Sequence, residues 1–296
     1  MRYIKEGFLG KLKNGKYAKV LNSIIHDDTL DLELRGDRIA VYYRGGKLFD
    51  LYDGKEYVVF NAKYGSNENP TVAVNEIENA IPSFKYSMDL YLSEHNIYEK
   101  EFQQLMVRVN NYTQYSNISK GTDYYIADFE YVSRSIGRFD LVGFKVDNYN
   151  LSTLSLIEMK YGKDSLDNEC GIQSHLSSFV KIFENKSGLA CLSEEMTKVL
   201  QQKYYLGLIP GLKAPSSDGL VEKMNAPKNM EVVFTLGDFN ELSDQLIDEL
   251  NSINPNDYQF DVFFAQSPFL GYGLYGSNFL SLRDVIERTQ IRKKQK

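Results

Sequence analysis

Tryptophan is absent from this chain, and cysteine and histidine are scarce. The chain has two cysteines, Cys170 and Cys191, and three histidines, His26, His95 and His175. Two cysteines are too few for a disulfide framework or for a zinc site of their own. With three histidines, no Ser-His-Asp or Cys-His set stands out as a nucleophilic site. The scarcity of cysteine favours a reducing, cytoplasmic location.

Long apolar runs and surplus positive charge are also missing. No stretch approaches the roughly 20 apolar residues of a membrane span, and residues 1–6 lead into no apolar segment of the signal-peptide type. We therefore expect neither a membrane anchor nor a secretion signal. Because 34 Lys and Arg face 40 Asp and Glu, the formal net charge is −6. Any surface that binds nucleic acid must then be a local basic patch.

Short runs rich in β-forming residues alternate with glycine turns in the first third of the chain. The runs cover residues 31–34, 38–43, 47–52 and 56–60. The breaks between them contain the glycine that a tight turn needs for a positive φ. We expect residues 1–85 to form an N-terminal β-rich meander, suited to recognition or to contact with a protein partner or a second copy of the chain. Residues 8–25 fit a helix or a pair of strands equally well.

Beyond residue 85 the pattern becomes mixed. Apolar spacing predicts a helix over residues 84–112. The elements predicted after it are strands at 124–132, 138–146 and 153–160, helices at 171–184 and 194–202, a short buried strand at 204–209, a strand at 231–236, a helix at 242–250 and a strand at 261–265. This order predicts an α/β fold over residues 86–296, with a central mixed β-sheet flanked by helices.

Three charged residues lie within two of these strands. Asp140 is flanked by Phe139 and Leu141, while Glu158 and Lys160 end a strongly apolar strand. Side chains two apart on a strand share a face, so Glu158 and Lys160 project together. Buried charges are costly unless they are paired or bound to metal. A structural ion pair at the sheet rim is therefore one interpretation, and a metal site is the other.

The metal interpretation has a specific chemistry. Two carboxylates, Asp140 and Glu158, suit Mg²⁺ or Mn²⁺, which takes oxygen ligands and keeps several waters. Lys160 would then position or activate a water, or offset charge on a phosphoryl group. Two neighbouring strands joined by a short connection bring Asp140 beside Glu158.

Asp140, followed by Glu158-Met159-Lys160, resembles the D…(D/E)-x-K signature of PD-(D/E)XK nucleases over roughly residues 86–265. Phe139 stands where the signature has proline. The resemblance implies a restriction endonuclease-like core. It also implies two further site residues: Glu101 as a metal ligand on the helix before the first core strand, and Gln173 on the helix after the third.

This resemblance implies a metal-dependent nuclease that hydrolyses phosphodiester bonds in DNA or RNA. The alternative is a catalytically inactive nuclease-fold binding or scaffold protein, which the acidic balance favours. Arg134 and Arg138 flank the turn before Asp140 and are interpreted as phosphate contacts or as surface charges, with the surface interpretation favoured for Arg134. His175, two residues after Gln173, could contact phosphate, but a lone histidine is more often structural. Residues 271–276 read G-x-G-x-x-G, but no βαβ unit surrounds them, so we interpret them as a loop.

Overall fold

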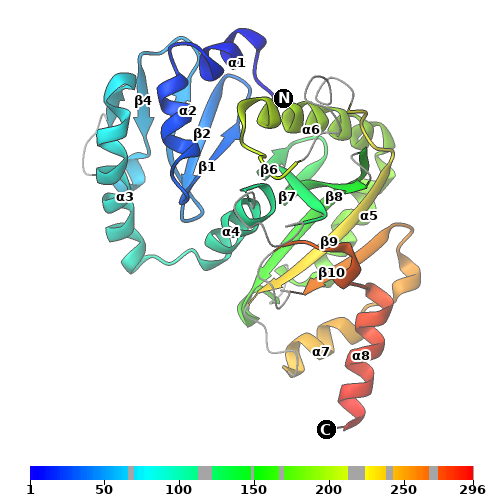
Figure 1. Ribbon diagram of the computed structural model, residues 1–296. Helices are drawn as coiled ribbons and strands as arrows, with labels where there is room; N and C mark the ends of the chain where they lie inside the picture. The colour runs from blue at the N-terminus through cyan, green and yellow to red at the C-terminus, as the bar shows by residue number, and fades with distance from the viewer. Residues whose placement is uncertain are drawn as a thin grey trace. The chain divides into compact units, whose positions relative to one another are not determined.

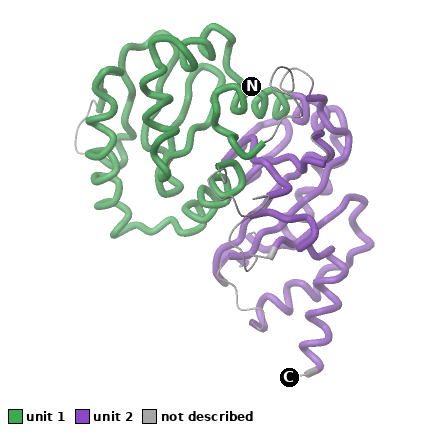
Figure 2. Tube along the Cα trace, viewed as in Figure 1, with its two compact units in different colours: residues 1–115, 195–223 green, residues 116–194, 224–296 purple. Residues whose placement is uncertain are grey.

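The computed structural model describes residues 1–65, 70–112, 122–147, 150–166, 170–212, 224–237, 243–266 and 273–295 (Figure 1). The chain forms two compact units (Figure 2). Unit 1 comprises residues 1–115 and 195–223, and unit 2 comprises residues 116–194 and 224–296. Among the described residues, no helix is both long and apolar enough to cross a membrane.

Unit 1 is built on a sheet in which antiparallel strands follow the order β1-β2-β3-β4-β5. Its elements are α1 (Glu6–Lys13), α2 (Ala18–Ile25), β1 (Leu30–Leu34), β2 (Arg38–Tyr43), β3 (Gly46–Tyr52), β4 (Tyr57–Phe60), β5 (Thr71–Ala73), α3 (Ile77–Glu94) and α4 (Tyr98–Tyr112). The predicted meander is confirmed in β1 to β4. Residues 8–25, which fitted a helix or strands, lie largely in α1 and α2.

The boundary expected near residue 85 does not coincide with the division into units. Residue 85 lies inside α3, and the following α4 also belongs to unit 1. The single helix expected over residues 84–112 is wrong, because the backbone leaves the helical region at His95, with φ −133° and ψ 79°. The apolar spacing continues through this break, so spacing alone did not reveal it.

Unit 2 contains a mixed sheet with the order β11-β10-β9-β8-β7-β6. Its elements are β6 (Tyr124–Ser133), β7 (Gly137–Asp147), β8 (Asn150–Tyr161), α5 (Ile172–Glu184), β9 (Asn229–Gly237), α7 (Asp244–Asn251), β10 (Asp261–Gln266), β11 (Phe279–Ser281) and α8 (Leu282–Gln295). Strands β6, β7 and β8 are antiparallel, β9 runs parallel to β8, and β10 runs parallel to β9. The predicted mixed α/β class with a central sheet is confirmed.

Helix α6 (Lys186–Leu206) contributes residues to both units, since the division falls between residues 194 and 195. The strand expected over residues 204–209 is wrong, because residues 204–206 complete α6. Short apolar runs fit a helix end as well as a buried strand, and here tertiary packing selects the helix.

Stacked aromatic rings hold α5 against the sheet of unit 2. Phe179 of α5 stacks on Phe139 of β7, with ring centroids 6.0 Å apart, and meets Phe234 of β9 edge-on at 6.4 Å. All three rings are at most 3% exposed. Such pairs contribute about 0.5–1.5 kcal/mol each beyond the burial of their area. They also fix the rotation of α5 and therefore the side chains that it directs at β8.

A buried ion pair ties α6 to β1 within unit 1. Lys203 Nζ donates to Glu33 Oε1 at 2.6 Å, and both side chains are fully buried. Arg35 lies 3.5 Å from the other carboxylate oxygen. The neighbouring Gln202 accepts from the N–H of Ile4 at 2.9 Å and donates to its carbonyl at 2.7 Å. The N-terminus and β1 are thus both bound by consecutive residues of α6.

Replacing Lys203 by methionine should destabilise unit 1 by roughly 3 kcal/mol, because it leaves the Glu33 carboxylate buried with a weaker partner. Urea unfolding followed by circular dichroism measures the loss. The matched control is Lys198→Met, a substitution at an exposed position of the same helix. Equal unfolding midpoints for the two variants would contradict this role of the ion pair.

Candidate active site

The site begins where β7 and β8 part. Their last paired residues are Leu141 and Ile157. Just beyond, the N–H of Met159 donates to Asp140 Oδ2 at 2.8 Å. The Asp140 carboxylate thus takes the place that a strand carbonyl would occupy in a continuing ladder. Met159 lies between Glu158 and Lys160, so this bond brings the three sequence-predicted residues to one point at the edge of the parted strands.

Glu158, Lys160 and His175 form a closed triangle beside Asp140. Lys160 Nζ lies 3.0 Å from Glu158 Oε1 and 3.0 Å from His175 Nε2. His175 Nδ1 lies 3.0 Å from the same Glu158 oxygen. Glu158 and Lys160 are only 5% and 4% exposed. Two charges are therefore buried at the end of β8, and each is satisfied by the other and by an imidazole from α5.

The donors and acceptors of this triangle fix the tautomer of His175. Burial, together with the positive charges of Lys160 and Arg138, lowers the pKa of His175 to about 4. The ring is therefore neutral at pH 7, with one donor and one acceptor nitrogen. An ammonium can only donate, so Nε2 accepts from Lys160 and Nδ1–H donates to Glu158. Every contact of the triangle then joins one donor to one acceptor.

The ionised form of the Asp140 carboxylate is destabilised by its burial. Burial raises its pKa, opposed by the Met159 N–H bond and by the charges of Lys160 and Arg138. The negative charge of Glu130 on β6 raises it further. Glu130 has a left-handed backbone, with φ 53°, which is uncommon for a non-glycine residue. Backbone strain and an unfavourably buried carboxylate thus occur within one small region.

Gln173 does not join this group. It is exposed, its N–H donates to Glu249 Oε1 at 2.9 Å, and its side-chain oxygen accepts from Ser252 at 3.3 Å. Because successive helical residues turn by about 100°, positions 173 and 175 lie on nearly opposite sides of α5. The helix therefore directs His175 toward β8 and Gln173 toward the end of α7.

A sequence signal for His175 was present. The buried residues Ile172, Leu176 and Phe179 mark the face of α5 that packs on the sheet. His175 falls on the same i, i+3, i+4, i+7 stripe, whereas Gln173 does not. A histidine on such a stripe is expected to pack against the sheet, and the half-buried His175 does so. The spacing of apolar residues, rather than a motif position, identifies it here.

Glu101 lies in unit 1, whereas Asp140, Glu158, Lys160 and Gln173 lie in unit 2. Its Oε1 accepts from Arg44 Nε at 2.5 Å, and Arg44 also pairs with Asp89 of α3 at 2.8 Å. A side chain at Gly45 would place its Cβ 2.2 Å from the Lys100 carbonyl carbon, so the start of α4 lies directly against the β2–β3 turn. Glu101 thus has a structural partner of its own within unit 1.

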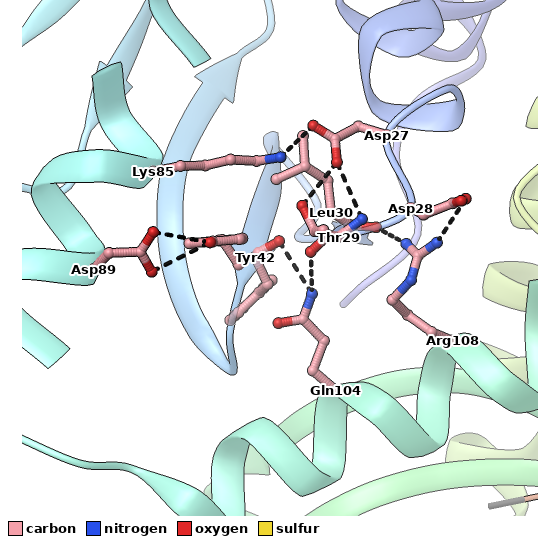
Figure 3. Close-up of polar contacts among 10 residues, drawn as sticks. Asp27, Asp28, Thr29, Leu30, Tyr42, Lys85, Asp89, Gln104 and Arg108 are labelled. Carbon is pink, nitrogen blue, oxygen red and sulfur yellow. Dashed lines mark hydrogen bonds and ion pairs between the residues drawn. The ribbon is translucent and has the colours of Figure 1, made fainter. Parts of the chain in front are cut away.

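The same helix is bound to backbone groups along its length, as Figure 3 shows for Gln104 and Arg108. Gln104 donates to the carbonyls of Thr29 and Tyr42 at 3.1 and 3.2 Å, and its oxygen accepts from Gly45 N at 2.5 Å. Arg108 donates to the carbonyl of Leu30. The polar side chains of α4 therefore have a structural role, which is to hold the helix against the backbone of unit 1.

The residues at β8 fit one class of cation. Within the described ranges, no group of three or more His, Cys, Asp or Glu side chains is arranged to hold a metal ion. Asp140 and Glu158 supply two buried carboxylates, and Oδ1 of Asp140 makes no hydrogen bond to a described residue. Mg²⁺ binds through one or two carboxylates and keeps several waters. The pair therefore suits Mg²⁺ or Mn²⁺ better than a zinc ion enclosed by four protein ligands.

The pKa of His175 should be measurable by NMR titration of its imidazole signals, with exposed His26 and His95 supplying signals of the same type. Its folded pKa, about 4, lies below the reference value of about 6.5. The unfolded chain therefore binds the proton more readily between these values, so the contribution of neutral His175 to stability is present above pH 6.5 and is lost as pH falls toward 4. Lys160→Met should raise the pKa of His175, and an unchanged value would contradict the triangle.

Comparison with known proteins finds no relative: no family model, no curated protein and no solved structure matches the chain. The likeness to PD-(D/E)XK nucleases is accordingly one of residue pattern.

Proposed function

We propose that this chain is a metal-dependent nuclease that hydrolyses phosphodiester bonds in DNA or RNA. The observation that carries the proposal is the meeting of Asp140, Glu158 and Lys160 around the backbone of Met159. A structural ion pair needs one carboxylate and one ammonium. Here a second buried carboxylate, whose pKa burial raises, lies beside such a pair. That excess of buried negative charge is what a divalent cation would compensate.

Each residue has a role that its contacts support. Asp140 and Glu158 would hold Mg²⁺ or Mn²⁺, which when bound polarises a phosphoryl oxygen and lowers the pKa of a water. Lys160 donates two of its three N–H groups, to Glu158 and His175. The third makes no hydrogen bond with a described residue, and it positions the attacking water or a phosphoryl oxygen. His175 holds the ammonium and Glu158 in register as a positioning residue.

The arrangement of unit 2 agrees with this proposal. Three antiparallel strands are followed by α5, by α6 and by β9, which runs parallel to β8. This order of strands and helices is compatible with the restriction endonuclease-like core that we propose. The two cysteines are free and exposed, which suits the reducing, cytoplasmic location that we propose for the enzyme.

With Mn²⁺ and single- or double-stranded DNA or RNA, the wild type should cleave at least one substrate. Lys160→Met and Asp140→Asn should each reduce the rate by about 10²–10⁴-fold, because they remove a group that acts on water or on the phosphoryl charge. Product release from end-labelled strands measures the rate. Lys181→Ala is the matched control, an exposed position on α5.

Thermal unfolding at pH 7 separates lost chemistry from lost structure. Because burial raises the pKa of Asp140, its ionised form reduces stability at neutral pH, and Asp140→Asn should not lower the melting temperature. Isothermal titration should show weaker Mn²⁺ binding by the same variant. Equal cleavage or equal metal binding by wild type and Asp140→Asn would sink the proposal and favour the scaffold alternative.

His175→Ala and Gln173→Ala should differ in their effects. Loss of His175 removes the acceptor of Lys160 and should reduce cleavage by about 10–100-fold, the usual effect of a group that orients metal-site residues. Gln173→Ala should stay within about twofold of wild type, since its side chain bonds to Ser252. Rate measurements over a range of pH check this, and the opposite ranking of the two variants would exclude the role given to His175.

A further inference from the structure

Arg138 differs from Arg35, Arg38 and Arg44 because its guanidinium is paired with no carboxylate of a described residue. Arg35, Arg38 and Arg44 each pair with at least one carboxylate. The side chain of Arg138 is exposed and makes no hydrogen bond or ion pair with any residue that the structure describes. An arginine held by no carboxylate keeps its full set of donors for a ligand.

Its position places this charge at the solvent-exposed edge of the candidate site. Arg138 lies near the start of β7, two residues before Asp140, and pairs across the strands with Val132, which is 62% exposed. The β6–β7 hairpin therefore presents Arg138 to solvent directly beside a buried carboxylate. The positive charge of the Arg138 guanidinium acts on residues of the site, since it lowers the pKa of both Asp140 and His175.

The charges within the site do not by themselves provide enough positive charge to bind a substrate phosphate. Lys160 is already bonded to Glu158 and His175, so its ammonium is shared with groups of the protein. Asp140 and Glu130 add negative charge nearby, which opposes the approach of an anion. A substrate phosphate therefore needs a further cation at the exposed edge of the site. Arginine suits this task because its planar fork binds two phosphate oxygens at once.

We propose that Arg138 binds a backbone phosphate of a nucleic-acid strand and so anchors the substrate with its scissile bond at Asp140 and Glu158. This inference rests on the proposed nuclease function and specifies its substrate as a polymeric phosphodiester. Arg138 acts in substrate binding, and the chemical step stays with the residues of β7 and β8.

The test measures binding of a fluorescein-labelled oligonucleotide by anisotropy, with Ca²⁺ in place of Mg²⁺, at several salt concentrations. Arg138→Gln should weaken binding, and the slope of log affinity against log salt should fall in magnitude by about one, the change expected on losing one phosphate contact. Arg138→Lys should recover part of the affinity, because the charge remains while the fork is lost. In cleavage assays Arg138→Gln should raise KM more than it lowers kcat.

Arg134→Gln is the matched control, since it removes the same charge from an exposed position in the same hairpin turn. It should keep the wild-type KM and most of the affinity. If wild type cleaves and Arg138→Gln matches Arg134→Gln in affinity, salt slope and KM, the inference fails while the nuclease proposal stands. If wild type neither binds nor cleaves any oligonucleotide, both fail together. Unchanged melting temperatures would show that the two exposed substitutions leave the fold intact.

Discussion

The bond from the Met159 N–H to the Asp140 carboxylate organises the candidate site. Where two antiparallel strands separate, backbone groups lose their ladder partners, and buried groups of this kind must find others. Asp140 supplies that partner with a side chain. The same contact that ends the pairing of β7 with β8 thus carries a negative charge to the residue between Glu158 and Lys160. One hydrogen bond therefore both ends the strand pairing and positions a carboxylate of the candidate site.

Compensation of buried charge decides the remaining arrangement. Glu158 and Lys160 neutralise one another, and the neutral His175 joins them without adding a charge. Asp140 is left as the less compensated carboxylate, in the neighbourhood of a strained Glu130. Proteins tolerate such local instability when the surrounding core is well packed, and the aromatic stack of Phe139, Phe179 and Phe234 provides that packing here.

The sequence predicted much of unit 2, because strand alternation and turn residues are local signals. It placed Asp140, Glu158 and Lys160 on neighbouring strands of a mixed sheet, where the structure has them. The motif position predicted Gln173 rather than His175, because a motif position does not show which way the helix directs its side chains. The sequence could not find the partner of Glu101, since Arg44 lies 57 positions away in the chain. Helix ends at His95 and Leu206 also depended on tertiary contacts.

Unit 1 is formed by two separate stretches of the chain, and the second stretch begins within helix α6, after much of unit 2. This order has consequences for biosynthesis. Residues 202 and 203 complete the packing around Ile4 and Glu33, yet they follow much of unit 2 in the chain. Domains generally fold from the N-terminus as they leave the ribosome. Here the first unit to emerge must wait for its last helix, with the Glu33 carboxylate lacking its ammonium until then. Translation therefore delivers β6, β7 and β8, with their catalytic candidates, before the N-terminal unit can close.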